Sequence, residues 1–290
     1  MMTSLPRQIE KIIEPEPVIE GAGVRLKRSI ATRRLDSLDP FLLLDHFASS
    51  DPRDYQAGFP LHPHRGIETV TYVLWGEVHH RDTLGNSGRI GAGDVQWMTA
   101  GRGIMHEEMP QVRPEGIAGF QLWVNLPAKL KMTAPRYQDI RSAQIPEIKR
   151  EDGARIRVIT GTVDEISGPV TGIAANPTYL DVFVPAHASF IQPIERGHTA
   201  FAYVFEGEAT FAGHDDDNED GTMMSHPRLV VWGDGDHVKV TTGNTPVRFL
   251  LVSGKPLHEP IARYGPFVMN TEGEIEQTLR ELREGTFVTM

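Results

Sequence analysis

Two pairs of side chains that can bind a metal ion lie close together in the sequence. His62 and His64 are separated by one residue, and so are His106 and Glu108. Side chains two positions apart on an extended strand point to the same face, so each pair can direct two donor atoms into one space. Imidazole nitrogen and carboxylate oxygen suit a divalent first-row metal such as Fe, Mn, Ni, Co or Zn. Four such ligands on a six-coordinate ion leave two positions for a substrate and O2.

The sequence between the two pairs predicts short strands joined by tight turns. Residues 67–74 place Thr69, Thr71 and Val73 on one face of a strand. The turn clusters GNSG and GAGD then separate a hairpin from a further strand. His79 and His80 are adjacent, so they face opposite sides of a strand and cannot act as a pair. We interpret both as surface residues.

The spacing around these residues resembles the cupin superfamily, whose fold is a small antiparallel β-barrel with a metal in its mouth. The pattern G-x3-HxH-x3-E-x7-G, from Gly58 to Gly76, is similar to the first cupin motif. The pattern G-x5-T-x-G-x4-H, which ends at His106, is similar to the second. Thr99 replaces the usual Pro of that motif, and the spacing from Gly101 to His106 is longer than usual.

Four stretches resemble the pirin family more closely: DPFLLLDHF, HPHRGIETVTYVLWG, TAGRGIMHEEMP and KPLHEPIARYGPFVMNT. The resemblance runs from about Val24 to about Thr271. It implies an all-β protein with two tandem cupin barrels of the double-stranded β-helix (jelly-roll) type, of which only the N-terminal barrel binds metal. It also implies that three His and one Glu, here His62, His64, His106 and Glu108, hold the ion, which we expect to be Fe(II), with Mn, Ni, Co or Zn as alternatives. Glu68 then falls outside the ligand set, and we expect it to orient a ligand or Arg65.

The second half of the chain reads as a degenerate repeat of the first. TAFAYVFEGEATF matches ETVTYVLWGEVHH, and GDGDHVKVTTG matches GAGDVQWMTAG. The residues that fall opposite the four ligands are Pro193, Glu195, Arg248 and Leu250. We therefore expect residues 1–165 to form a metal-binding domain and residues 166–290 to form a second barrel without a comparable metal site.

Two further segments have recognisable patterns. In GEIEQTLRELREGTF, Ile275, Leu279 and Leu282 recur at helical spacing before Gly285, which predicts a short C-terminal helix. HDDDNEDG, from His214 to Gly221, begins like an EF-hand loop. Its twelfth position is Pro227, where calcium binding requires a bidentate Glu. A solvated acidic loop is therefore the favoured interpretation.

Composition narrows the class of protein. The 28 Gly and 21 Pro in 290 residues favour many short strands over long helices. The formal net charge of −10 disfavours direct nucleic-acid binding, and the basic stretch VRLKRSIATRRL fits a solvated strand face. The chain has no cysteine, no apolar leader and no run of about 18 apolar residues. We expect a soluble, cytoplasmic monomer that does not insert into a membrane.

The pirin resemblance implies quercetin 2,3-dioxygenase activity, the O2-dependent ring opening of a flavonol with loss of carbon monoxide. Glu108 would serve both as a ligand and as the base that accepts the proton of the substrate hydroxyl. An alternative of another class is a metal-binding, redox-sensing regulator that acts through a protein partner, with residues 24–35 as the first candidate surface. A third possibility is a metal-binding double barrel that acts on a different small molecule.

Overall fold

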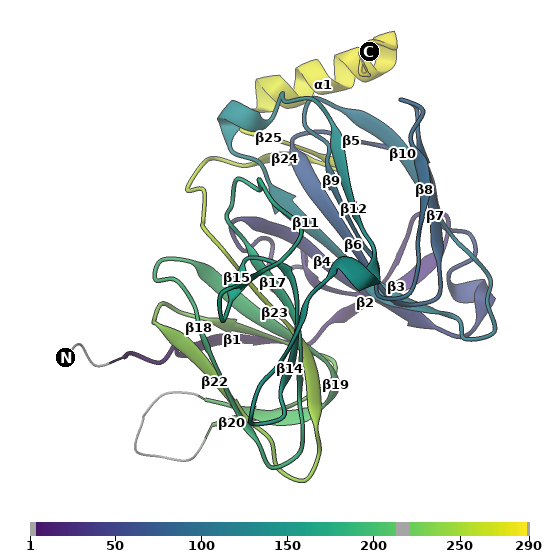
Figure 1. Cartoon of the computed structure of the whole chain (residues 1–290). Coiled ribbons are helices and arrows are strands. Elements are labelled where there is room, and N and C mark those ends of the chain that lie inside the picture. Colours follow the sequence, from purple (N-terminus) through teal and green to yellow (C-terminus); the bar gives the residue numbers. More distant parts are fainter. Residues whose placement is uncertain (1–3, 213–220, 289–290) are drawn as a thin grey trace. The chain divides into compact units, whose positions relative to one another are not determined.

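The computed structural model describes residues 4–212 and 221–288 (Figure 1). Its contacts divide the chain into two compact units. We call residues 16–142 and 257–290 the histidine unit, and residues 1–15 and 143–256 the apolar unit. The acidic stretch 214–220, which begins the EF-hand-like pattern, lies outside the described residues. Among the helices that are described, none is long and apolar enough to cross a membrane.

The histidine unit is built from antiparallel sheets. In spatial order, the seven-stranded sheet contains β12 (Arg136–Ile140), β9 (Val95–Thr99), β6 (Ile67–Trp75), β11 (Ile117–Asn125), β4 (Phe41–Ser49), β3 (Val24–Ile30) and β2 (Glu16–Glu20). The four-stranded sheet contains β5 (Phe59–His64), β10 (Ile104–Pro110), β7 (Val78–Asp82) and β8 (Ser87–Ile90). A ribbon follows, formed by β24 (Ala262–Tyr264) and β25 (Phe267–Met269). Short 3-10 turns span η1 (Pro52–Asp54) and η2 (Ala128–Leu130).

One apolar cluster joins the two larger sheets of this unit. Val73 of β6 and Ile117 of β11 pack in the same cluster as Val78 of β7 and Ile90 of β8. The two sheets therefore enclose a common interior, as a barrel requires. β6 is buried on both faces over most of its length, and the face that carries Thr71 and Val73 is the one directed into the barrel.

The apolar unit contains a second antiparallel barrel. Its main sheet runs β1 (Ile9–Ile13), β21 (Arg228–Trp232), β19 (Thr199–Phe211), β23 (Val247–Gly254), β17 (Thr178–Val184), β14 (Arg155–Thr160) and β13 (Glu147–Lys149). Further pairs are made by β18 (Ser189–Pro193), β20 (Thr222–Ser225), β22 (His237–Thr241), β15 (Thr162–Val163) and β16 (Ile166–Ser167). A continuous apolar cluster that includes Phe190, Phe211 and Phe249 occupies its interior.

The predicted C-terminal helix is α1 (Glu272–Glu284). Thr271 caps its first turn and forms a reciprocal capping box with Glu274. Gly285 ends the helix in the left-handed conformation, with φ of 73°. Ile275 packs with Phe267 of β25, so the helix completes the histidine unit.

The two contact units are not continuous in sequence, whereas the sequence predicts a single domain boundary at residue 165. That boundary stays a prediction. Residues 257–290 belong to the histidine unit, because β24, β25 and α1 pack there. Residues 143–165 belong to the apolar unit, because β14 pairs with β17. A strand pattern does not state which sheet the strand will join, so the sequence alone gives no sign of this exchange.

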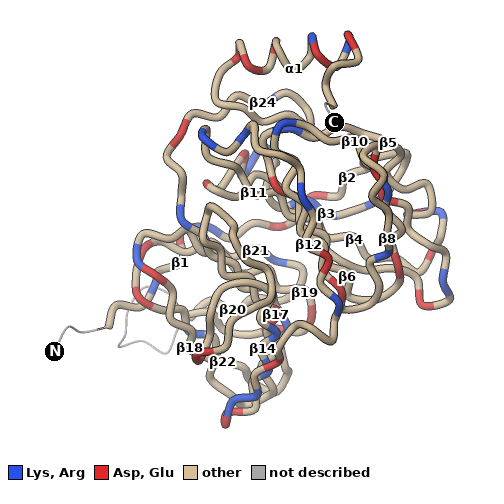
Figure 2. The backbone as a smooth tube through the Cα atoms, turned by 45° about the horizontal axis from the view of Figure 1, so that its top comes forward, with Lys and Arg blue, Asp and Glu red and all other residues tan. Residues whose placement is uncertain are grey.

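Acidic and basic residues are interspersed along both units (Figure 2). The predicted basic strand face is only partly solvated. Arg25 and Lys27 of β3 are exposed, whereas Arg28 turns inward and forms a bidentate ion pair with the buried Asp45, with two N–O distances of 2.7 Å.

Candidate metal centre

The two predicted pairs lie on neighbouring antiparallel strands. His62 on β5 is directly opposite His106 on β10, and His64 is opposite Ile104. The register then shifts, so that Glu108 faces Phe59. Such an irregularity re-aims the side chains on the bulged strand and is frequent beside functional sites.

The three histidines converge on one point. One ring nitrogen from each of His62, His64 and His106 lies within 4.8 Å of the others. The ring centroids are 4.5 to 5.2 Å apart, and the Nε2 atoms of His62 and His64 are separated by 3.1 Å. Two nitrogens bound at about 2.0–2.1 Å to adjacent positions of one ion would be about 3 Å apart. The observed spacing thus matches that of two ligands sharing a metal.

The protonation states also suit metal binding. Nδ1 of His62 donates to the Pro60 carbonyl at 2.9 Å, so Nε2, which faces His64, is the nitrogen positioned to bind a metal. Neither ring nitrogen of the buried His106 has a hydrogen-bond partner among the described residues, a costly arrangement unless a ligand satisfies it. Burial and the neighbouring His62 lower the pKa of His64 to about 3. Burial also holds the pKa of His106 well below its ordinary value, so both rings are neutral donors at pH 7.

Glu108 lies beside this cluster rather than within the group of mutually close donor atoms. Its side chain is buried, and Oε1 accepts a hydrogen bond from Thr71 Oγ1 at 2.9 Å. Glu108 lines the same cavity as His62 and His64. Its role as the fourth ligand stays a prediction.

A row of polar side chains extends from Glu108 across the seven-stranded sheet. Thr71, Gln121, Asp45 and Arg28 stand directly opposite one another on β6, β11, β4 and β3. Thr71 Oγ1 lies 2.9 Å from both Glu108 Oε1 and Gln121 Oε1. A hydroxyl has one proton, so an ionised Glu108 requires the Gln121 amide to turn its nitrogen toward Thr71. The resulting chain of donors, Gln121 to Thr71 to Glu108, fixes the orientation of the carboxylate.

The cluster opens into a cavity of about 590 Å³. Phe47, Phe59 and Trp123 give the cavity aromatic walls, and Gln121 and Asp45 add polar groups. A cavity of this size that combines aromatic walls with polar groups on one side of the candidate metal ligands is compatible with a small-molecule site. Segments far apart in the sequence line it, since Arg263, Gly265 and Pro266 belong to the C-terminal part of the histidine unit.

Lys131 holds the turn that follows β5, the strand that carries His62 and His64. The sequence alone does not predict this role. Its side chain is 1% exposed, and Nζ donates to Gly66 O, Asn125 Oδ1 and Val268 O at 2.8–3.0 Å. These bonds tie the turn that follows His64 to the C-terminal segment. A lysine in a Pro-containing stretch looks like an ordinary surface residue, so the sequence carries no signal for this role.

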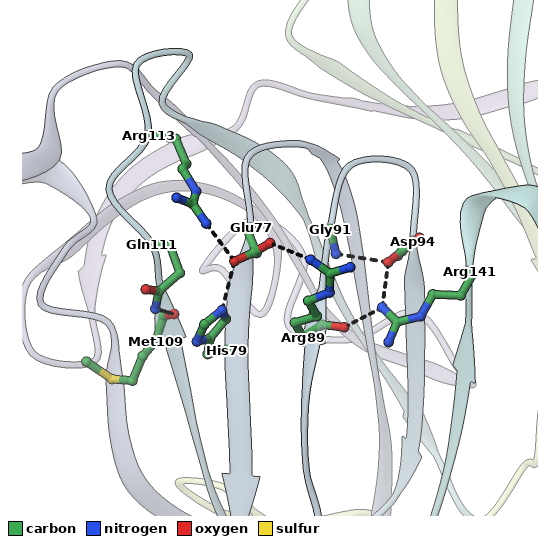
Figure 3. Close-up of polar contacts among 9 residues, drawn as sticks. All are labelled: Glu77, His79, Arg89, Gly91, Asp94, Met109, Gln111, Arg113 and Arg141. Carbon is green, nitrogen blue, oxygen red and sulfur yellow. Dashed lines mark hydrogen bonds and ion pairs between the residues drawn. The ribbon is translucent and has the colours of Figure 1, made fainter.

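The interpretation of His79 and His80 as surface residues is right for His79 only. His79 is exposed and bonds Glu77, which also pairs with Arg89 and Arg113 (Figure 3). His80 is buried, and its Nε2 accepts from Gln96 at 2.8 Å. Alternation along β7 turns His80 into the barrel because its neighbour Val78 belongs to the core.

The sequence predicts that Glu68 orients a metal ligand or Arg65, but its hydrogen-bond partner is a different residue. Glu68 Oε1 accepts from Thr99 Oγ1 at 2.8 Å. Arg65 instead bonds Thr278 and pairs with Glu281 of α1. Glu68 lies on the face of β6 opposite Thr71, which keeps it away from the histidines.

In the apolar unit, the residues that align with the four candidate ligands make contacts unrelated to metal binding. Glu195 is exposed and lies 3.3 Å from His198. Arg248 pairs with Asp181 at 2.7 Å, and Leu250 is fully buried.

A mostly antiparallel double barrel with a histidine cluster in one barrel defines a protein of the cupin type. The family model described as Pirin matches residues 23–124, and the model described as Pirin C-terminal cupin domain matches residues 179–288. A Pirin-like protein of Caulobacter vibrioides is 42% identical over 97% of this chain and 99% of its own length. The chain therefore belongs to the pirin family.

Two solved structures extend the comparison. The crystal structure of quercetin 2,3-dioxygenase from Acinetobacter baumannii is 34% identical, with a TM-score of 0.86 over 98% of this chain and 99% of that chain. The crystal structure of a bacterial pirin from Escherichia coli in complex with nickel(II) is 18% identical, with a TM-score of 0.64 over 85% of this chain and 98% of that chain. At that identity the second likeness concerns the fold alone.

Proposed function

We propose that this pirin is a metal-dependent dioxygenase that opens the ring of a flavonol with O2, as a quercetin 2,3-dioxygenase does. The observation that carries the proposal is the convergence of three imidazoles, of which those of His62 and His64 line an aromatic-walled cavity. His62, His64 and His106 would hold the ion, with Glu108 as the fourth ligand. The similarity to the Acinetobacter baumannii quercetin 2,3-dioxygenase supports a reaction of this type.

The roles of the residues follow from their positions. When bound, a divalent metal supplies Lewis-acid stabilisation of the deprotonated 3-hydroxyl oxygen of the flavonol. Glu108 accepts the proton of that hydroxyl, and Thr71 holds its carboxylate in place through Oε1. Phe47, Phe59 and Trp123 contact the flat rings and exclude water. The electron-rich substrate anion then reacts with O2, and the ring opens with loss of carbon monoxide.

Oxygen uptake by metal-loaded protein with quercetin tests this function. The wild-type protein should consume O2 and release carbon monoxide in step with quercetin loss. His62→Ala should lose bound metal and turnover together, because one of the three converging donors is removed. Quercetin turnover that persists in the metal-free variant would contradict the proposal.

The alternative, a regulator that acts through a protein partner, loses one residue of its candidate surface. Arg28, in the middle of the proposed basic surface, is committed to Asp45 and Glu20 inside the cavity. The other four basic residues of that surface, Arg25, Lys27, Arg33 and Arg34, remain exposed. A co-purifying protein, together with an absence of O2 uptake, would favour the regulator.

A further inference from the structure

The cavity contains two arginines whose surroundings differ. Arg28 uses Nε and Nη2 on Asp45 and Nη1 on Glu20, each at 2.7 Å. Two carboxylates therefore neutralise it. Arg263 has no carboxylate within ion-pair distance among the residues that the structure describes. Its contacts are a bond from Nη1 to the Leu42 carbonyl at 3.2 Å and a long one from Nε to the Gly265 carbonyl at 3.5 Å.

Arg263 is held in place by an aromatic ring rather than by an opposite charge. Its guanidinium carbon lies 5.2 Å from the ring centroid of Trp123. The same indole meets the ring of His64 edge-on, at 5.1 Å between centroids. A ligand that lies against Trp123 can therefore touch the histidine cluster and Arg263 together. No described residue accepts a hydrogen bond from Nη2 of Arg263. This nitrogen of the guanidinium group can therefore donate to a ligand.

We propose that Arg263 and Trp123 form a subsite for a planar aromatic ligand that carries a carboxylate. A guanidinium fork matches the geometry of a carboxylate, and its charge-assisted hydrogen bonds are roughly twice as strong as neutral ones. Trp123 provides a flat surface for an aromatic ring. The subsite rests on the proposed function only in taking the cavity as the place where ligand binds. It adds aromatic carboxylates to the ligands that this cavity can take, beside the neutral flavonol of the proposed function.

Calorimetric titration with 2-naphthoate and 2-naphthamide tests the subsite. The two probes have nearly the same size and shape, and only the first is charged. Metal-loaded wild-type protein should bind the naphthoate tighter by on the order of 10- to 100-fold, the range expected for a hydrogen bond to a charged group. Arg263→Gln should bring the two affinities within about threefold, because it removes the charge and keeps a polar side chain. Arg263→Lys should keep a reduced preference.

Two controls separate the outcomes. Arg25→Gln removes a charge from the exposed side of β3, outside the cavity, and should leave the preference unchanged. Unchanged thermal unfolding of Arg263→Gln would show that the fold is intact. Equal binding of both probes by the wild type, or a preference that survives in Arg263→Gln, would overturn the proposal. A preference that depends on Arg263 without O2 uptake on quercetin would retain the subsite and remove the flavonol dioxygenase.

Discussion

At matching positions of their main sheets, the barrel of the histidine unit carries polar residues and the barrel of the apolar unit carries apolar ones. In the histidine unit the row across β6, β11, β4 and β3 is Thr71, Gln121, Asp45 and Arg28. When Gly76 is aligned with Gly207, the row across β19, β23, β17 and β14 becomes Ala202, Leu251, Leu180 and Val158. Every member of the second row is buried in the apolar core. The same strand arrangement thus carries a polar row beside the candidate site in one barrel and an apolar core row in the other.

Under the proposed function, the polar row serves the candidate site rather than the stability of its barrel. Polar groups in a barrel interior require partners, and each unsatisfied one costs about 1–3 kcal/mol, whereas the apolar row has no such requirement. The histidine unit satisfies its row by pairing, with Arg28 on Asp45 and Thr71 on Glu108. The predictions below test this difference between the two barrels.

The largest expected effect is the loss of metal from a single barrel. His106→Ala should reduce bound metal from one ion per chain to none, because it removes one of three converging donors. Arg248→Gln, at the aligned position of the apolar unit, should leave the metal content unchanged. Elemental analysis after dialysis measures both variants, and equal losses in the two would contradict the assignment.

The next largest effect is a loss of folding stability when a core residue of the apolar unit is truncated. Leu251→Ala should lower the free energy of unfolding by about 2–5 kcal/mol, since Leu251 is 1% exposed in a packed core. Gln121→Leu at the matching position should change it by less than about 1 kcal/mol, because a polar side chain is exchanged for an apolar one of similar size. Denaturant unfolding of both variants measures the difference. A similar loss of stability in both would mean that the polar row is structural.

A pH effect of intermediate size should come from Glu68. Burial raises its pKa from 4.5 to about 7, so the folded state binds this proton more tightly than the unfolded state does. The contribution to stability is therefore fully present below about pH 4.5 and is lost as the pH rises through about 7, by roughly 3 kcal/mol. Glu68→Gln should flatten the unfolding free energy over this range. If the unfolding free energies of the wild type and of Glu68→Gln changed in parallel with pH, the raised pKa of Glu68 would be refuted.

The smallest effect should come from the hydroxyl that orients Glu108. Thr71→Val keeps the shape of the side chain and removes the donor to Oε1. Quercetin turnover should fall by about 10-fold, as is typical when a partner of a metal-site residue is removed. Ala202→Ser, at the aligned position of the apolar unit, should not change turnover, which makes it a matched control. An unaffected Thr71→Val enzyme would mean that Glu108 needs no orienting partner.

The sequence predicted the parts of the site that depend on local spacing. The alternation of a strand brings His62 and His64 to one face, and the β5–β10 pairing brings His106 beside them. The terminal helix is predictable for the same reason, since its apolar spacing and its Gly stop are local, whereas the double barrel follows from the resemblance to pirins and from the repeat in the sequence.

Other features depend on contacts between distant segments and had no local signal. Arg263 reaches the cavity because residues after 256 return to the histidine unit. Lys131 is buried because three acceptors from separate segments surround its ammonium. The inward turn of His80 depends on the register of β7, which adjacent histidines alone do not reveal.

The most direct test of the account is to locate the metal in crystals of the nickel-loaded protein by anomalous scattering. The account predicts one strong peak per chain, within bonding distance of His62, His64 and His106, and none inside the apolar unit. A peak in the second barrel, or fully loaded protein whose only peaks lie on its surface, would contradict the division of roles between the two barrels.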